Sequence, residues 1–164
     1  MTIGLRWCMT TVGAVCAVLG SLGSTPARAG NAAIELRARG VQIYVCEPAA
    51  AGFAWRLKGP EATLTDAAGF EVGHHFAGPS WQAKDGSTVV GEALTSSQAQ
   101  TEGSVPWLVL RAKSHAGSGA YSSVDYIVRM HTEGGAAPMA GCDQAHTGTE
   151  SRVGYDAVYV LFPH

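Results

Sequence analysis

Short runs in which apolar and polar residues alternate dominate this chain and constrain its fold. The pattern appears at residues 40–46, 53–58, 107–113 and 124–131, and a closing run at 153–162 is apolar at nearly every position. Alternation is typical of β-strands because successive side chains point to opposite faces of a sheet. The closing run predicts a strand that is buried on both faces.

Turn-forming residues separate these runs, since the 164 residues include 21 glycines and 7 prolines. The sole helix candidate is a short one at 92–102, with a turn near 33–40 as a further irregularity. Parallel sheets need crossover helices, which are missing from this pattern. The sequence therefore predicts an all-β fold, a single-domain antiparallel β-sandwich or barrel of about 8–10 short strands with little helix.

The first 29 residues have the layout of a secretory signal peptide. Arg6 precedes an apolar segment at 7–23, and small residues at 24–29 precede the expected cleavage after Ala29. The apolar segment is shorter than the ~20 residues of a spanning helix, so we expect no stable membrane anchor. We expect residues 30–164 to be exported, to the periplasm or the outside, as one β domain.

The charge of the expected mature chain argues against a nucleic-acid partner. Removing the signal removes Arg6 and Arg28 from 11 basic residues and none of the 13 acidic ones, leaving 9 against 13. The net charge of −4 offers no basic face to neutralise phosphates. We therefore expect no nucleic-acid partner, and the pattern indicates no particular oligomeric state.

Cysteine usage fits an oxidising compartment. Cys8 and Cys16 lie in the signal, so Cys46 and Cys142 remain in the mature chain. Two cysteines in an exported chain favour one disulfide, and a pair of free thiols is the alternative. Such a bridge would tie an early strand to a late loop, and the chain-entropy model assigns about 4–5 kcal/mol to closing a loop of that size.

Two adjacent histidines stand in the segment FEVGHHFAGPSW, residues 70–81. On a regular strand they point to opposite faces. His74 shares its face with apolar residues, so we expect it in the core, hydrogen-bonded to a backbone carbonyl. His75 shares the polar face with Glu71, so we expect it to be free to titrate. The apolar residues on the face of His74 are Phe70, Val72 and Phe76.

A metal site is not expected from these histidines. A site that used both His74 and His75 would need a bulge, and zinc or copper needs three or four ligands. His115, His131 and His146 show no ligand spacing. We therefore predict no metal and no other cofactor.

A hairpin turn is predicted at Asp85-Gly86, because this dipeptide suits a type I′ turn, which needs two residues with positive φ. Centring the turn there pairs Trp81 with Val90. Asp85 then serves the turn and is not a candidate catalytic acid.

Motifs of familiar catalytic classes are missing from the sequence. There is no Gly-x-Ser-x-Gly elbow and no phosphate-cradling or dinucleotide-binding loop. Glycoside hydrolysis needs two facing carboxylates, and the sequence singles out no pair among 13 acidic residues. We therefore assign no catalytic residue.

The chain resembles a family of exported bacterial and fungal proteins known as domain of unknown function 3455. The resemblance covers about residues 40–162, and the family implies a compact, mostly β domain without an assigned activity. It also implies a disulfide between Cys46 and Cys142. The blocks that carry the resemblance are GVQIYVC (40–46), Trp55 with GPEATL (59–64), GHHFAGPSW (73–81), DGS (85–87), PWLVL (106–110), GGAAPMAGC (134–142) and YDAVYVLF (155–162).

Three functions remain open at this point. The leading hypothesis is a non-catalytic exported domain that binds a small molecule, a glycan or an envelope component. Trp107 and Arg111 motivate it, because an aromatic ring beside cations suits a sugar or an anion, and His75 with Glu71 are the other candidate binding residues. One alternative is an enzyme that uses His75 as an acid or base with a nearby carboxylate. The other is a structural or protein-interaction module.

Overall fold

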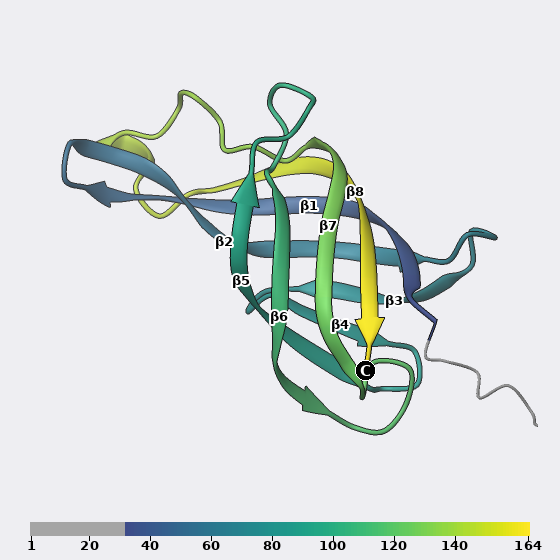
Figure 1. The fold of residues 1–164 in the computed structure, drawn as a ribbon. Coiled ribbons are helices and arrows are strands. Elements are labelled where there is room, and N and C mark those ends of the chain that lie inside the picture. The colour runs from purple at the N-terminus through teal and green to yellow at the C-terminus, as the bar shows by residue number, and fades with distance from the viewer. Residues whose placement is uncertain (1–31) are drawn as a thin grey trace, which may run out of the picture.

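The computed structural model describes residues 32–164, which form a β-barrel with one short 3₁₀ helix in the described part (Figure 1). The predicted signal peptide lies outside the described residues. No helix from residue 32 onward is long and apolar enough to cross a bilayer. The elements are β1 (Ile34–Ala49), β2 (Gly52–Thr65), β3 (Glu71–Phe76), β4 (Ser80–Ala83), β5 (Thr88–Ser97), β6 (Trp107–Ala116), β7 (Val124–Gly134), the 3₁₀ helix η1 (Gln144–His146) and β8 (Glu150–Pro163).

Each strand pairs antiparallel with the next along the chain, and β1 pairs with β8 to close the barrel. The predicted all-β, antiparallel, single-domain fold is confirmed in its barrel form. Several strands are longer than expected: β1 has 16 residues and β2 and β8 have 14 each. The helix predicted at 92–102 is wrong, because β5 continues to Ser97. Residues 92–97 are all exposed, so a helix there would have had no apolar face to bury.

The core fills the barrel interior, and inward positions alternate along each strand. In β8 the buried side chains are Tyr155, Ala157, Tyr159 and Leu161. The valines between them are only partly buried on the outer wall, so this strand is covered on one face and not on both as predicted. The other large core residues include Leu36, Leu64, Trp81, Val89, Leu110, Val124 and Ile127.

Polar side chains also occupy the interior. His75 stacks on Trp81 with ring centroids 4.3 Å apart, and Tyr159 meets both rings edge-on at 5.1 and 5.3 Å. Arg129 is buried nearby, where its Nε donates to the carbonyl of Pro106 at 3.0 Å. Buried polar groups need such partners, and the Arg129 guanidinium has one in this backbone carbonyl.

The hairpin between β4 and β5 turns where predicted, but its register differs by one residue. Trp81 pairs with Val89 and not with Val90, because the loop has three residues and Ala83 N–H donates to the carbonyl of Ser87. Of the two central residues only Gly86 has a positive φ, +87°, which excludes a type I′ turn. The Asp85 carboxylate accepts from the Ser87 amide at 2.8 Å and stabilises the longer loop.

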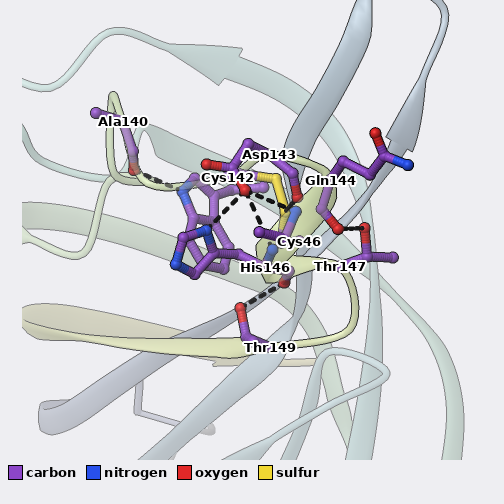
Figure 2. Close-up of a disulfide and its surroundings, with 10 residues drawn as sticks. Cys46, Ala140, Cys142, Asp143, Gln144, His146, Thr147 and Thr149 are labelled. Carbon is purple, nitrogen blue, oxygen red and sulfur yellow. Dashed lines mark hydrogen bonds and ion pairs between the residues drawn. A yellow bond between two sulfur atoms is a disulfide. The ribbon is translucent and has the colours of Figure 1, made fainter.

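The tip of the β1–β2 hairpin projects beyond the barrel, and the loop with η1 runs beside it (Figure 1). A disulfide between Cys46 on β1 and Cys142 joins the two, so the predicted bridge forms (Figure 2). The Trp55 indole donates to the carbonyl of Ala140 at 3.0 Å. Beside the bridge the Asp143 carboxylate accepts from the amides of Ala145 and His146, which caps η1.

Candidate functional site

Outward side chains of β8, β1, β2 and β3 form two parallel rows on the barrel wall, because strand register aligns them. One row contains Asp156, Arg39, Thr63 and His74, and the next contains Gly154, Val41, Glu61 and Phe76. The β1, β2 and β3 members of both rows line a depression of about 490 Å³, which we call the β1 groove. Its lining residues are Arg39, Gly40, Val41, Glu61, Ala62, Thr63, His74, His75, Phe76 and Arg152.

Small residues form the floor of the β1 groove. Gly40 and Ala62 are paired in register, and a Cβ on Gly40 would lie 2.1 Å from the carbonyl oxygen of Glu61 and 2.7 Å from Cβ of Ala62. Distances this short leave no room for a side chain at residue 40. The close approach of β1 and β2 thus requires glycine, and the wall is thin at this point.

Two ion pairs lie at the rim of the groove. Arg39 Nε contacts Asp156 Oδ1 at 2.7 Å, and Arg152 reaches from β8 across β1 to Glu61 on β2. The hydrogen bond from Arg152 holds the pKa of Glu61 below its usual value. Each pair offers both donors and acceptors, and the half-exposed ring of Phe76 lies in the same row as Glu61. The groove therefore combines hydrogen-bonding groups of both kinds with an apolar surface.

His75 lies beneath the groove, inside the barrel. It pairs in register with Ala62 and Trp81, is 3% exposed, and its Nδ1 lies 2.9 Å from the carbonyl oxygen of Ser80. A carbonyl only accepts, so Nδ1 carries the proton. Burial lowers the pKa of His75 to about 4, and the charge of Arg129 acts in the same direction. His75 is therefore neutral at pH 7.

The predicted orientation of the two histidines is wrong, although they do point to opposite faces. His75 is the core histidine with a backbone carbonyl partner, and the His74 side chain is 56% exposed on the outer wall. Phe70, predicted to face the core, is 71% exposed. The reason is the register, which places Gly73 and His75 opposite the buried Ala83 and Trp81. Phe70 and Phe76 are therefore exposed, while Val72 is partly buried against the core.

The four predicted binding residues lie at three separate places. His75 is inside the barrel. Glu71 lies outside, where its Oε1 is 3.8 Å from His74 Nε2 and from Lys84 Nζ. The structure therefore does not bring Glu71 to His75.

Trp107 and Arg111 share the outer face of β6, as the alternation predicts. They are four residues apart, or about 13 Å along a strand. The Trp107 ring is partly buried against His131, with centroids 5.3 Å apart, and Arg111 lies 3.6 Å from Glu92. Neither residue lines the β1 groove.

Metal-binding groups do not gather in the described residues. Nowhere between residues 32 and 164 do three or more His, Cys, Asp or Glu side chains form a cluster that could hold a metal ion. The Asp143–His146 contact at 2.7 Å beside the disulfide is a pair that fixes η1 (Figure 2).

Sequence reasoning missed most of the groove, including Arg39, Arg152 and Phe76. The charged residues at alternate positions 37 and 39 were a signal for an outward polar face on β1. The approach of Arg152 to Glu61, however, depends on register across three strands, and alternation within a single strand carries no such information.

Comparison with known proteins gives one match. A family model described as a protein of unknown function, DUF3455, matches residues 26–163. No curated protein matches the chain, and no solved structure matches it. The resemblance found in the sequence is thus supported, and it adds no activity.

Proposed function

The chain belongs to the DUF3455 family of proteins of unknown function, and from its geometry we propose that it is an exported, non-catalytic domain that binds a glycan in the β1 groove. The observation that carries the proposal is the placing of the Phe76 ring beside the Arg152–Glu61 pair, over a floor made of Gly40 and Ala62. Export is supported by the disulfide, which suits an oxidising compartment.

The chemistry of the groove suits a sugar ring. A sugar has an apolar face of C–H groups and a rim of hydroxyls, each of which donates and accepts. The exposed part of Phe76 can stack on the apolar face. Arg39 and Arg152 can donate to hydroxyls, while Glu61 can accept from them. An anion would use only the donors, which are already paired with carboxylates, so a neutral or weakly charged glycan fits better.

Binding is favoured over catalysis by the state of the ionisable groups. General acid catalysis needs a carboxyl group with a raised pKa, whereas the Glu61 pKa is lowered by Arg152. His75, the acid or base of the enzyme hypothesis, is neutral, buried and bonded to Ser80, and its pKa of about 4 lies far from neutrality.

We expect Arg152→Ala and Phe76→Ala each to weaken glycan binding about tenfold, which corresponds to about 1.4 kcal/mol. The first removes donors and leaves Glu61 unpaired, and the second removes the stacking surface. Binding is measured by titration calorimetry with ligands first selected on an array of envelope and plant glycans. Arg152 is on the outer wall, and exposed ion pairs contribute little to stability, so Arg152→Ala should change thermal melting little.

Arg111→Ala is the matched control, because Arg111 is also an exposed arginine beside a glutamate, Glu92, on another part of the wall. It should leave the affinity unchanged. If Arg111→Ala weakens binding and Arg152→Ala does not, the ligand lies on β6 and the assignment to the β1 groove is wrong. An array without a single bound glycan would also reject the proposal.

A further inference from the structure

The projecting part of β2 has an open edge. From Gly52 to Pro60 this strand pairs with β1 alone, and pairing with β3 begins only at Glu61. In the part of the chain that the structure describes, no backbone hydrogen bond outside the β1 ladder reaches residues 53–58. Up to the irregularity at Lys58, which has no partner on β1, every second residue of this stretch therefore directs its N–H and C=O away from β1, as an edge strand does.

A groove lined by apolar residues, with backbone polar groups also at its surface, lies along this open edge. Cys46 and Trp55 are paired in register and so share a face of the hairpin, which the loop at 137–142 covers. A groove of about 330 Å³ separates the hairpin from this loop. Ala54 belongs to the opposite face of β2 and still lines the groove, so the groove reaches the strand edge. Its lining residues also include Phe53, Trp55, Pro138 and Met139.

Exposed apolar side chains extend the groove. Met139 is fully exposed and Leu57 is 58% exposed. The loop that carries Met139 is joined to β1 by Cys46–Cys142 (Figure 2), so the groove keeps its shape without a partner. A flexible thioether at the rim can adapt to different apolar side chains.

On the other face, both charged residues of the edge strand itself are cations, while Glu47 and Glu150 lie on the strands behind it. Arg56 and Lys58 alternate with the apolar residues and are exposed. Lys58 contacts Glu150 at 2.5 Å, but Arg56 forms no ion pair with any residue from 32 to 164. A strand added here would therefore meet the unpaired Arg56 on one face and the groove on the other.

We propose that the β2 edge, residues 53–58, binds an extended segment of another protein by strand addition. The segment carries apolar residues at every second position, directed into the groove, and acidic residues between them, directed at Arg56. Backbone hydrogen bonds would provide affinity and the alternate side chains specificity. A second copy of this chain fits less well, since antiparallel pairing of two β2 edges would gather two copies of Arg56 and Lys58 on one short ladder.

The test uses a probe peptide of eight residues in which valine alternates with glutamate. We expect it to bind with a dissociation constant in the micromolar range and to shift amide NMR signals at residues 53–58. Replacing its glutamates by lysines should weaken binding at least tenfold. Two further peptides carry N-methyl groups at alternate residues, one at the odd and one at the even positions. Binding should be abolished only in the peptide whose methyl groups replace the N–H groups that would donate to β2.

Three variants localise the interaction. Arg56→Glu should reverse the preference, so that the lysine peptide binds more tightly than the glutamate peptide. Met139→Ser should weaken binding about fivefold without changing the melting temperature, because this side chain is fully exposed. Lys113→Glu, an exposed cation on the paired strand β6, is the matched control and should change neither affinity nor preference.

Several results would overturn the proposal. They are equal binding of the acidic and basic peptides, equal binding of both methylated peptides, and no binding of any peptide at millimolar concentration. In the last case Arg56 and Lys58 would act only to keep the edge unpaired. Light scattering that shows a dimer of the wild-type protein, with amide NMR shifts at residues 53–58 that depend on protein concentration, would make a second copy the occupant. The peptide comparisons use the wild-type protein, so the test stands even if a variant fails to fold.

Discussion

Removing the disulfide should lower the free energy of unfolding by about 4–5 kcal/mol. Cys46 and Cys142 are separated by 96 positions in the sequence, and the chain-entropy model gives about 4.7 kcal/mol for a loop on the order of 100 residues. Small domains are stable by only about 5–15 kcal/mol. The double variant Cys46→Ala/Cys142→Ala should therefore melt roughly 15 °C lower and unfold at a clearly lower urea concentration.

Local contacts decide which residues lose stability when the disulfide is removed. The loop keeps the Trp55–Ala140 hydrogen bond, and Cys46 keeps its backbone bonds to Gly148 and Thr149. We therefore expect the double variant to fold into the same barrel, with faster amide exchange in residues 136–149. Wild-type protein with the bridge reduced is the control for the lost sulfur atoms. A double variant that unfolds at the same urea concentration as the oxidised wild type would contradict the entropic account.

Fold class followed from the sequence because it depends on local patterns. Alternation and turn residues each act within a few positions, so Gly86 could be placed in a hairpin loop. The register error of one residue arose because Asp-Gly suits two turn geometries. The side chain of Asp85, through its hydrogen bonds to Ser87 and to the Ala120 amide at 2.8 Å, selects the longer loop. Ala120 is far along the chain, so local sequence patterns do not predict the longer loop.

The inward faces were harder to predict than the strands themselves. Counting apolar residues placed His74 inside, since it alternates with Phe70 and Phe76. This barrel instead buries His75 against Trp81 and Tyr159, and buries Arg129 nearby. A side-chain count assumes that the apolar side of a strand is the buried one, and that fails where a stacked polar group completes the core.

The groove depended on long-range information. A glycine inside a strand normally weakens it. Only the close contact with Ala62 shows why residue 40 is glycine. Arg152 and Glu61 are 91 positions apart, and only closure of the barrel through the β1–β8 pairing brings them together. The disulfide was predictable for the opposite reason, since it follows from residue type and compartment and needs no register.

Acid should destabilise the protein well above the pH at which its carboxylates titrate, because of His75. Burial lowers the folded-state pKa of His75 to about 4, while an unfolded histidine has a pKa of about 6.5. Between these values the unfolded chain binds a proton that the folded chain does not, so stability falls as the pH falls. The contribution of neutral His75 to the free energy of unfolding is fully present above about pH 6.5 and lost by about pH 4. At 1.36 kcal/mol for each pKa unit, the loss is on the order of 3 kcal/mol.

The slope of stability against pH is the measurement, taken from urea unfolding at intervals between pH 7 and 4.5. His75→Phe should flatten this slope because it keeps a ring against Trp81 without a titrating group. It also removes the hydrogen bond from Nδ1 to the Ser80 carbonyl, which costs about 1 kcal/mol at every pH and leaves the slope unaffected.

His74→Gln is the matched control, because it removes the neighbouring histidine from the outer wall. It should keep the wild-type slope, since the exposed His74 side chain is hydrated in both the folded and the unfolded state. A flat slope in His74→Gln with an unchanged slope in His75→Phe would place the titrating histidine outside, contrary to the structure. The pKa of Glu61 is lowered in the folded state, so its contribution is lost as the pH falls below the ordinary glutamate pKa of about 4.3. The interval above pH 4.5 therefore distinguishes the imidazole from the groove carboxylate.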